Sequence, residues 1–382
     1  MKKMIALCAA LAAVKLIRPI KAHAWWGRTH DDITAKAIDL IEKENKPKQF
    51  EFFNEYREEI VDGCTEPDSR NDCDRGSGMH YYSYTNRHGK ELECTAGYYR
   101  NRCGDFSKSS RTMLEENYTS ALCLYKSGKI KEAMHVLGRA AHFIEDMSCT
   151  PHVSNIRNFE RPSNIHHAFE KNINTICTQF TADRFDKRLL KSYEGDSFEA
   201  AANKLIKTSA RFVEGISTLD PKAFGEAAET MLPIAQQNVM ALLLKFYDDA
   251  HAEGGNFIVS DKAYTVKNEM SGMVLTITKK GAMLDKPDKE KQQKLMFKIY
   301  SLGAFGIQTQ DTGFLNKKCN GFDYLKAGSE PALFRLAALG KRRFRITTGG
   351  TDFEEVLTCT KNGSLAIDDF DPEDPGQIWV IS

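Results

Sequence analysis

Histidines and acidic residues recur at helical spacing in the middle of the chain. His142 and Asp146 are four residues apart, and His166 and Glu170 repeat this spacing. In a helix, two side chains at such a spacing leave from the same face. Imidazole nitrogens and carboxylate oxygens both bind zinc at about 2.0–2.2 Å, so each pair could converge on one ion. A single pair is more often a surface hydrogen bond, but two pairs with His152 between them indicate a metal centre.

Further candidate ligands lie upstream. Asp68 follows Pro67, and His80 lies twelve residues after Asp68 in a stretch rich in Gly, Asp, Asn and Cys. His30 lies five residues after Trp25, which we expect to be the N-terminus of the mature chain. A free α-amino group and its own carbonyl oxygen can chelate a metal, but only after the preceding segment has been removed. Processing would therefore complete the site.

The first 24 residues are typical of a secretory signal. Two lysines precede a short apolar run at 4–14, and Ala22-His23-Ala24 supplies the small-x-small pattern of a cleavage site. A membrane anchor would need about 20 apolar residues, and Lys15 interrupts the run too early for that. We expect residues 1–24 to be cleaved and the protein to be secreted, to the outside of the cell or to the periplasm.

Length and charge narrow the class of protein. A chain of 382 residues with 41% hydrophobic and 27% charged residues is typical of a globular protein with more than one domain. The 53 basic residues nearly balance the 52 acidic ones, and five of the basic residues lie in the expected signal, so the mature chain is slightly acidic. This balance gives no electrostatic reason to expect binding to nucleic acid or to an anionic membrane.

Cysteines in a secreted chain predict disulfides. After loss of Cys8, cysteines remain at Cys64, Cys73, Cys94, Cys103, Cys123, Cys149, Cys177, Cys319 and Cys359. We expect the pairs 64/73 and 94/103 to staple one loop region, with 149/177 and 319/359 as further pairings. The odd residue is Cys123, which we expect to be a buried free thiol in a helix. The absence of any CxxC pair excludes a zinc ribbon.

The periodicity of apolar residues divides the mature chain in two. Residues 29–250 show helical periodicity, with a helix opening at residue 29 and others expected at 128–147, 164–178 and 234–250. Residues 61–110 look like a long loop. After Gly254-Gly255, runs such as YTVK, MVLTIT, FRITT and IWVIS alternate in the manner of strands. We therefore expect a helical domain at 25–255 and a β-rich domain at 256–382.

The β-rich part contains an approximate threefold repeat. Tyr264, Phe305 and Phe344 head three segments of about 40 residues. The residues that close the segments are Phe297, Phe334 and Trp379. This pattern favours a β-trefoil, and Gln377-Ile378-Trp379 resembles the QxW signature of ricin-type lectin repeats. A β-sandwich is the alternative.

Taken together, the candidate ligands resemble the bacterial zinc-dependent phospholipase C family of the alpha-toxin type. The family pattern runs from an N-terminal Trp and a His, through Pro-Asp-x11-His and LGxAxH[FY]xxDxxxxxH, to HxxxE. Here the central part is LGRAAHF at 137–143 followed by Asp146 and His152, and His166 with Glu170 ends the pattern. The resemblance covers about residues 25–250.

The resemblance implies three zinc ions. The first would be bound by Asp68, His80, His142 and Asp146. The second would be bound by His152, His166 and Glu170. The third would be bound by the amino and carbonyl groups of Trp25 with His30, and would share Asp146.

The resemblance also implies a reaction, namely hydrolysis of phosphatidylcholine-type phospholipids to diacylglycerol and a phosphorylated headgroup. Zinc would polarise the phosphodiester and make a water molecule nucleophilic at neutral pH. Asp68 is the candidate general base, and the alternative is that it is a ligand only. Tyr81 and Tyr82 could offer their rings to a choline ammonium, or simply pack within the loop.

Two other functions remain open at this point. The short interval between Trp25 and His30 is closer to that of the trinuclear-zinc single-strand nucleases, but those end in HxxxD, whereas this chain has Glu170. A lectin whose helical domain has lost activity is a further alternative, although all the expected ligands are present. The expected partner is a phospholipid at a membrane surface, with glycan or lipid binding by the β-rich domain and no nucleic acid.

Overall fold

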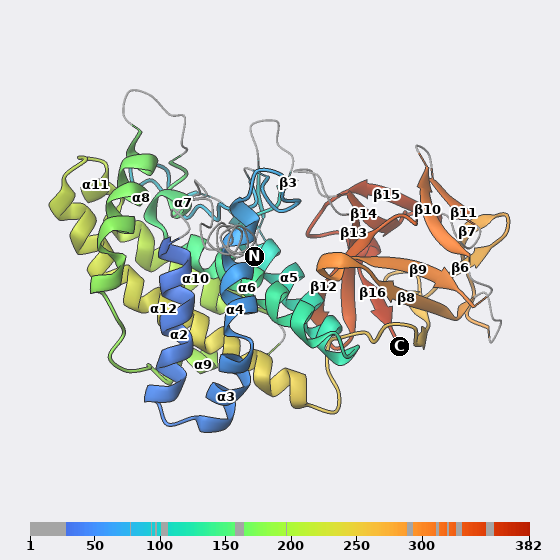
Figure 1. The fold of residues 1–382 in the computed structure, drawn as a ribbon. Coiled ribbons are helices and arrows are strands. Elements are labelled where there is room, and N and C mark those ends of the chain that lie inside the picture. Colours follow the sequence, from blue (N-terminus) through green and yellow to red (C-terminus); the bar gives the residue numbers. More distant parts are fainter. Residues whose placement is uncertain are drawn as a thin grey trace, which may run out of the picture.

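The computed structural model describes residues 28–76, 78–92, 94–95, 98–100, 106–156, 164–195, 197–288, 293–310, 313–318, 321–325, 331–348 and 355–382. Within these residues a helical region is followed by an antiparallel β region (Figure 1). This order confirms the predicted fold class. The expected signal segment 1–24 and Trp25 lie outside the described residues.

Helices dominate the chain from residue 28 to residue 251, as predicted. They are α2 (Arg28–Lys43), α3 (Pro47–Glu55), α4 (Arg57–Thr65), α5 (Ser110–Lys126), α6 (Ile130–Ser148), α7 (Thr150–Val153), α8 (Ile165–Ile176), α9 (Arg188–Tyr193), α10 (Glu199–Ser209), α11 (Val213–Ile216) and α12 (Pro221–His251). The helix predicted at 128–147 is α6, the one at 164–178 is α8, and the one at 234–250 is the second half of α12.

Helix α6 packs against α4 through two glycines. A Cβ atom added to Gly63 would lie 2.0 Å from the carbonyl oxygen of His135, and one added to Gly138 would lie 2.0 Å from the carbonyl oxygen of Ile60. Only glycine permits so close a contact between two helix backbones. The contact brings the end of α4, and the short 3-10 helix η1 (Glu66–Asp68) that follows it, against α6.

Helix α2 packs against α4, α6 and α12 (Figure 1). Its buried face includes Ile33, Ala37, Leu40 and Ile41, which recur at helical spacing. The same helix buries His30 near its start, so the packing of its apolar face directs a histidine toward α6.

The predicted long loop starts later than expected, because α4 and η1 occupy residues 57–68. From residue 69 to residue 109 the described chain holds only the short strands β1 (Cys94–Thr95), β2 (Tyr98–Arg100) and β3 (Phe106–Ser107). The backbone N–H groups of Tyr84 and Thr85 both donate to the carbonyl oxygen of Val153, at 2.8 and 3.1 Å. The loop is therefore tied to the segment that follows α6.

The disulfide prediction is wrong for three of the four pairs. Cys64, Cys73, Cys149, Cys177 and Cys359 are free thiols, so the pairs 64/73, 149/177 and 319/359 are absent. The sulfur atoms have other partners: Cys64 donates to the carbonyl oxygen of Val61, and Cys73 accepts from Arg335. Cys123 is buried and free, as predicted. The pair 94/103 falls outside the side chains that the structure describes.

The β region begins twelve residues after α12 and holds the predicted strands. They are β4 (Ala263–Tyr264), β5 (Val266–Asn268), β6 (Val274–Thr278), β7 (Gly281–Asp285), β8 (Leu295–Ile299), β9 (Phe305–Thr309), β10 (Phe314–Lys318), β11 (Gly321–Leu325), β12 (Phe334–Gly340), β13 (Arg343–Thr348), β14 (Glu355–Cys359), β15 (Leu365–Asp369) and β16 (Trp379–Ile381). The predicted boundary after residue 255 lies between α12 and β4.

The strand pairings form a circuit that one chain connection, from β4 to β5, closes. From β5 it passes through β16, β13, β12, β9 and β8 to β4, which directly precedes β5 in the chain. The pairs β6–β7, β10–β11 and β14–β15 are three hairpins that extend from this circuit.

The repeat residues lie opposite one another in this circuit. Phe305 is paired with Phe334, and Phe344 is paired with Trp379. Tyr264 is paired with Leu295, and its ring packs edge-on against that of Phe297 at a centroid distance of 6.0 Å. The residues that repeat in the sequence therefore lie on paired strands. The β-trefoil itself stays a prediction.

The helical and β regions share one continuous apolar core. Helix α5 packs against β12, and the 3-10 turn Ser301–Gly303 sits against α5. A Cβ atom added to Gly303 would lie 2.4 Å from the Cβ of Ser120, and Gly303 also has a φ of +72°. Glycine is required there on both counts.

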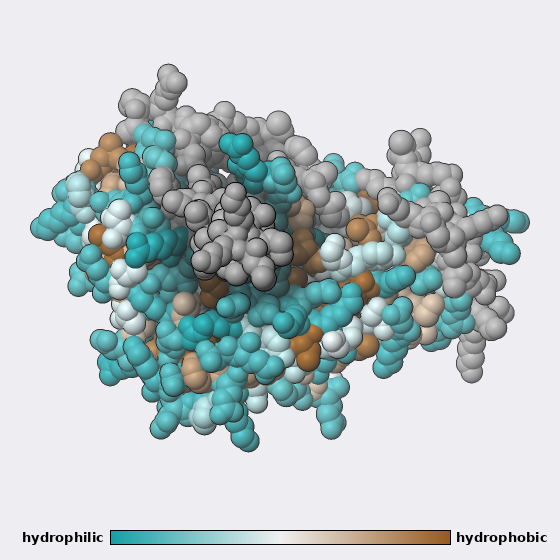
Figure 2. All heavy atoms as spheres, viewed as in Figure 1, coloured by the Kyte–Doolittle hydropathy of each residue, from teal (hydrophilic) through white to brown (hydrophobic). Residues whose placement is uncertain are grey.

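Among the helices of the described residues, none combines the length and the apolar character that crossing a bilayer requires. On the face drawn in Figure 2, hydrophilic residues cover most of both regions and apolar residues are scattered among them.

Candidate metal centre

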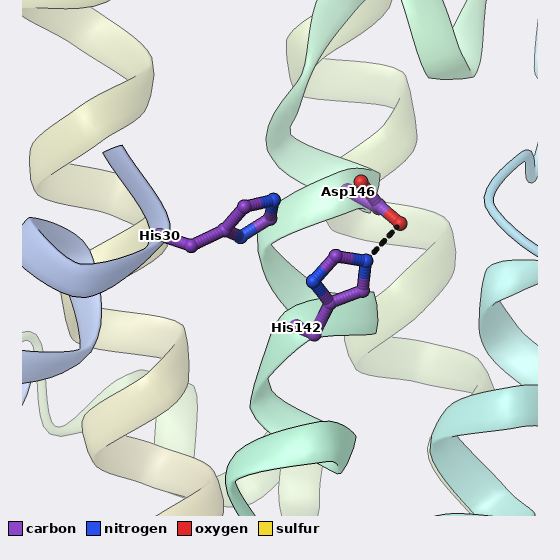
Figure 3. Close-up of side chains that lie close together, drawn as sticks. All are labelled: His30, His142 and Asp146. Atoms are coloured by element: carbon purple, nitrogen blue, oxygen red, sulfur yellow. Dashed lines mark ion pairs between the residues drawn. The ribbon is translucent and has the colours of Figure 1, made fainter. Parts of the chain in front are cut away.

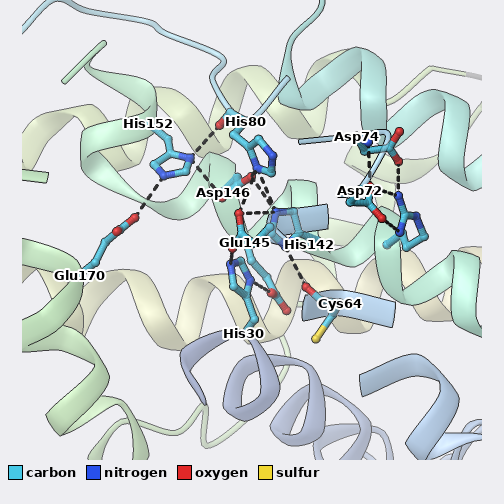
Figure 4. A network of polar contacts seen from close by, with 12 residues as sticks. His30, Cys64, Asp72, Asp74, His80, His142, Glu145, Asp146, His152 and Glu170 are labelled. Atoms are coloured by element: carbon cyan, nitrogen blue, oxygen red, sulfur yellow. Dashed lines mark hydrogen bonds and ion pairs between the residues drawn. The ribbon is translucent and has the colours of Figure 1, made fainter. Parts of the chain in front are cut away.

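The structure brings eight of the nine predicted ligands together. Trp25, the ninth, lies outside the described residues. The eight come from α2, η1, the loop after it, α6, α7 and α8, and they are His30, Asp68, His80, His142, Asp146, His152, His166 and Glu170. Each of these side chains is at most 8% exposed. Figure 4 shows most of them converging on the inner face of α6.

Asp146 is at the middle of the cluster. Its Oδ2 lies 2.9 Å from Nδ1 of His80 and 3.1 Å from Nε2 of His142 (Figure 4). Its Oδ1 lies 3.1 Å from Nδ1 of His152. Asp68 completes this part of the cluster, with its Oδ1 3.7 Å from Nδ1 of His80. One carboxylate therefore adjoins three histidines from three separate segments.

His30 approaches the same carboxylate from α2. Its ring is stacked on that of His142 at a centroid distance of 4.2 Å, and Figure 3 shows both rings beside Asp146. Its Nε2 lies 3.7 Å from Oδ2 of Asp68. The three-residue group His30, His142 and Asp146 has ligand atoms within 4.8 Å of one another. This is the arrangement in which two ions could share Asp146.

A second group lies between α7 and α8. Oε1 of Glu170 is 2.6 Å from Nε2 of His166 and 3.3 Å from Nε2 of His152. The two Nε2 atoms are 3.2 Å apart. Three ligand atoms so close together point at one position, which fits the predicted second ion.

Outer hydrogen bonds orient the rings. Nδ1 of His142 donates to the carbonyl oxygen of Cys64 at 2.7 Å, Nδ1 of His152 to that of His80 at 2.7 Å, and Nδ1 of His166 to that of Ile156 at 2.8 Å. Zinc-binding histidines usually donate their second N–H in this way, which leaves the other nitrogen free for the metal. Here each free nitrogen is Nε2.

Glu145 serves His30 in the same way, and the sequence did not point to it. Its carboxylate accepts a short hydrogen bond from Nδ1 of His30 and another from Oγ1 of Thr34 at 2.6 Å. Glu145 is fully buried. It directly precedes Asp146 in the chain, but its role depends on where α2 crosses α6, which no local pattern reveals.

The two tyrosines after His80 are buried, and Tyr81 packs against two of the ligands. Tyr81 is buried and stacked on His152 at a centroid distance of 4.9 Å, and its hydroxyl lies 3.1 Å from Nδ1 of His166. Tyr82 is buried and donates to Oδ1 of Asn203. The packing alternative is therefore the one observed, and neither ring is placed to receive a choline group.

The charges of the cluster suit a cation. Burial raises the pKa of Asp68 to about 6. Burial would also raise the pKa of Asp146, but His142, His152 and His80 outweigh it and hold that pKa well below its usual range. The pKa of His30 is lowered by burial and by His142, so this ring is neutral and has a lone pair to offer.

Unpaired buried atoms give a direct test of whether a metal fits. Nε2 of His30 and Oδ2 of Asp68 are buried and have no hydrogen-bond partner among the described residues. Leaving such an atom unpaired costs about 1–3 kcal/mol. Because both belong to the predicted ligand set, and nitrogen and oxygen are donors that zinc prefers, the residues fit zinc.

Comparisons with known proteins agree with this chemistry. A family profile described as zinc-dependent phospholipase C matches residues 29–225. A comparison with curated protein sequences gave no match.

Two solved structures share the fold. The alpha-toxin of Clostridium perfringens from avian strain SWCP is 15% identical, with a TM-score of 0.50, and the alignment covers 92% of this chain and 95% of the toxin. The alpha toxin from Clostridium absonum is 16% identical, also with a TM-score of 0.50, over 79% of this chain and 96% of that one. At this identity the likeness concerns the fold alone.

Proposed function

The chain belongs to the zinc-dependent phospholipase C family, and we propose that it cleaves phosphatidylcholine-type lipids into diacylglycerol and a phosphorylated headgroup. Membership of this family indicates that the chain is a phospholipase C that hydrolyses phospholipids. The headgroup and the products are our proposal. The observation that carries the proposal is the convergence of eight buried ligands around Asp146.

We propose three zinc positions. Asp68, His80, His142 and Asp146 would bind one ion, and His152, His166 and Glu170 a second. His30 and Asp146, with the backbone of Trp25, would bind the third. Ions held there would act as Lewis acids toward the phosphodiester and would make water acidic enough to attack at neutral pH.

Asp68 is placed to take the proton from the attacking water. It is buried, its Oδ2 has no hydrogen-bond partner among the described residues, and burial raises its pKa to about 6. A base works best when its pKa is close to the working pH. The alternative role, ligand only, predicts that Asp68→Asn lowers zinc content and activity together.

Substrate choice can be tested by direct comparison. Purified mature protein is assayed in parallel on phosphatidylcholine, phosphatidylethanolamine, sphingomyelin and single-stranded DNA, each with and without a chelator. We expect release of phosphocholine and diacylglycerol that the chelator stops and added zinc restores. Cleavage of DNA with no attack on any lipid would contradict the proposal and favour the nuclease alternative.

We further propose secretion, with cleavage before Trp25. The support is the basic start, the apolar run at 4–14 and the Ala22-His23-Ala24 pattern. N-terminal sequencing of the secreted protein should begin at Trp25. A protein that retains residues 1–24, or that stays inside the cell, would contradict this.

For the β region we propose a β-trefoil that contacts sugars or lipids at the membrane surface. Two glutamines support the repeat. Gln377 accepts from the N–H of Asp371 and donates to the carbonyl oxygen of Asp369. Gln293 makes the same two kinds of bond, to the N–H of Asp288 and the carbonyl oxygen of Lys286. Binding of the full chain to a glycan array or to lipid vesicles would support the proposal, and binding to neither would contradict it.

A further inference from the structure

A network of charges joins the β region to the metal centre, and its members are buried except Glu66, whose side chain is 39% exposed. Its acidic members lie on either side of Asp68 in one segment or on α5, and its basic members come from the loop, α6 and β12. They are Glu66, Asp72, Asp74 and Glu116, with Lys108, Arg139 and Arg335. Figure 4 draws Asp72 and Asp74 in the same view as the metal ligands.

Arg139 holds the Asp68 segment on both sides. From α6, its Nη1 donates to Oε2 of Glu66 at 2.6 Å, and its Nη2 donates to Oδ1 of Asp72 at 2.6 Å and to Oδ2 of Asp74 at 2.7 Å. Arg139 is fully buried and lies one helical turn before His142. Glu66 and Asp72 bracket Asp68, so the position of Asp68 relative to α6 depends on these contacts.

Arg335 reaches the same segment from β12. Its Nη1 lies 2.8 Å from Oδ1 of Asp74 and 3.7 Å from Oε2 of Glu116, and its Nη2 donates to Sγ of Cys73 at 3.1 Å. The side chain is 7% exposed. Burial alone would raise the pKa of Asp74, but Arg335 and Arg139 outweigh it and hold that pKa well below its usual range.

Removal of Arg335 would leave the buried carboxylate of Asp74 with only one of its two guanidinium partners, Arg139. Asp74 is 1% exposed and Glu116 is 1% exposed, and Glu116 would keep its contact with Lys108. A buried carboxylate that loses one of two cationic partners is less well compensated, so the segment that carries it shifts from its position. The part free to move is the loop end of the segment, because α5 and α6 are held by their packing.

From these contacts we infer that Arg335 is a positioning residue for the metal centre, acting through Asp74 on the segment Glu66–Asp74 that carries Asp68. The inference rests on the proposed role of Asp68 at the zinc site. It makes the β region part of the catalytic unit, in addition to any role at a surface.

The test compares Arg335→Met with Arg343→Met in the full mature chain. Arg343 also pairs with an acid, Glu269, at the β region's surface, where its side chain is 36% exposed. Zinc loss is followed during titration with a chelator, kcat and KM are measured on a soluble short-chain phospholipid, and a urea midpoint verifies that each variant is folded. The chelator titration needs no substrate, so it stays informative even if the proposed lipid is wrong.

We expect folded Arg335→Met to release one zinc equivalent at about tenfold lower chelator concentration and to lose about tenfold in kcat with KM little changed. Arg343→Met should match the wild type. A folded Arg335→Met with the wild-type chelator profile and kcat would overturn the inference. If Arg335→Met does not fold, Asp74→Asn replaces it: the same shift in zinc release supports the inference, and a wild-type profile overturns it.

Discussion

Oδ2 of Asp146 lies 2.9 Å from Nδ1 of His80, and Oδ1 of the same carboxylate lies 3.1 Å from Nδ1 of His152. Asp146 belongs to the proposed first zinc position and, with His30, to the third, whereas Glu170 lies beside His152 and His166 at the second. A carboxylate shared by two zinc ions lowers the repulsion between them. Binding of both ions therefore depends on Asp146.

This difference predicts unequal effects for two conservative substitutions. Asp146→Asn should lower zinc content by more than one ion per chain, and Glu170→Gln by about one. The loss in kcat/KM should be at least about tenfold greater for Asp146→Asn, which corresponds to about 1.4 kcal/mol. Metal analysis and kinetics on the two variants measure this directly, and equal losses would contradict the shared role of Asp146.

Glu145→Gln should weaken the position next to His30. The carboxylate accepts from Nδ1 of His30, and its loss leaves the ring less well oriented and its Nε2 less basic. Outer partners of this kind typically change metal affinity by about 10–100-fold. Thr34→Val, which removes only the second hydrogen bond to Glu145, is the matched control and should have a smaller effect. Chelator titration distinguishes them; identical curves for Glu145→Gln and wild type would contradict the prediction.

The network around Arg335 predicts a particular pH dependence of stability. The pKa of Asp74 is well below its usual range in the folded protein and about 3.9 when unfolded. Its ionisation therefore contributes stability above about pH 4, and that contribution is lost as the pH falls further. The same holds for Glu66, whose pKa is lowered to about 2, first by the hydrogen bond from His135 and also by Arg139.

Arg335→Met removes one of the two guanidinium groups that stabilise ionised Asp74. The difference in free energy of unfolding between wild type and variant should be largest at neutral pH, and it should shrink as the pH falls below about 4. Urea unfolding of metal-free protein at a series of pH values measures it. A difference that stays constant down to pH 3 would show that Asp74 does not carry the effect.

Gly138→Ala should destabilise the protein by about 1–3 kcal/mol, because the new methyl group would meet the carbonyl oxygen of Ile60 on α4. Gly225→Ala in α12 is the control, since a Cβ atom there has no neighbour within 4 Å. The control should be neutral or stabilising by up to about 1 kcal/mol, as alanine favours helix more than glycine does. Equal urea midpoints for both variants would mean that α4 and α6 adjust without cost.

Much of this centre can be predicted from the sequence because helical spacing is local. The pairs His142/Asp146 and His166/Glu170 lie on helix faces that apolar periodicity already orients. The convergence of His30, Asp68 and His80 is not local, and it was accessible only through the resemblance to a family pattern.

Other contacts leave no signal in one sequence. The position of Glu145 beside His30 depends on how α2 crosses α6, and the pairing of Arg335 with Asp74 depends on how β12 docks against the loop. The disulfide prediction failed for a related reason. Cysteine number and compartment predict that thiols pair, but they do not reveal that Cys73 lies beside Arg335 or that Cys64 is buried in α4.

The most direct test of the zinc centre is the metal content of the purified mature chain. Elemental analysis after mild purification, with protein concentration determined independently, should find two to three zinc ions per chain. The buried ligands around Asp146 and Glu170 account for that number. Zinc at trace level only, in a chain shown to be folded and to begin at Trp25, would contradict the account.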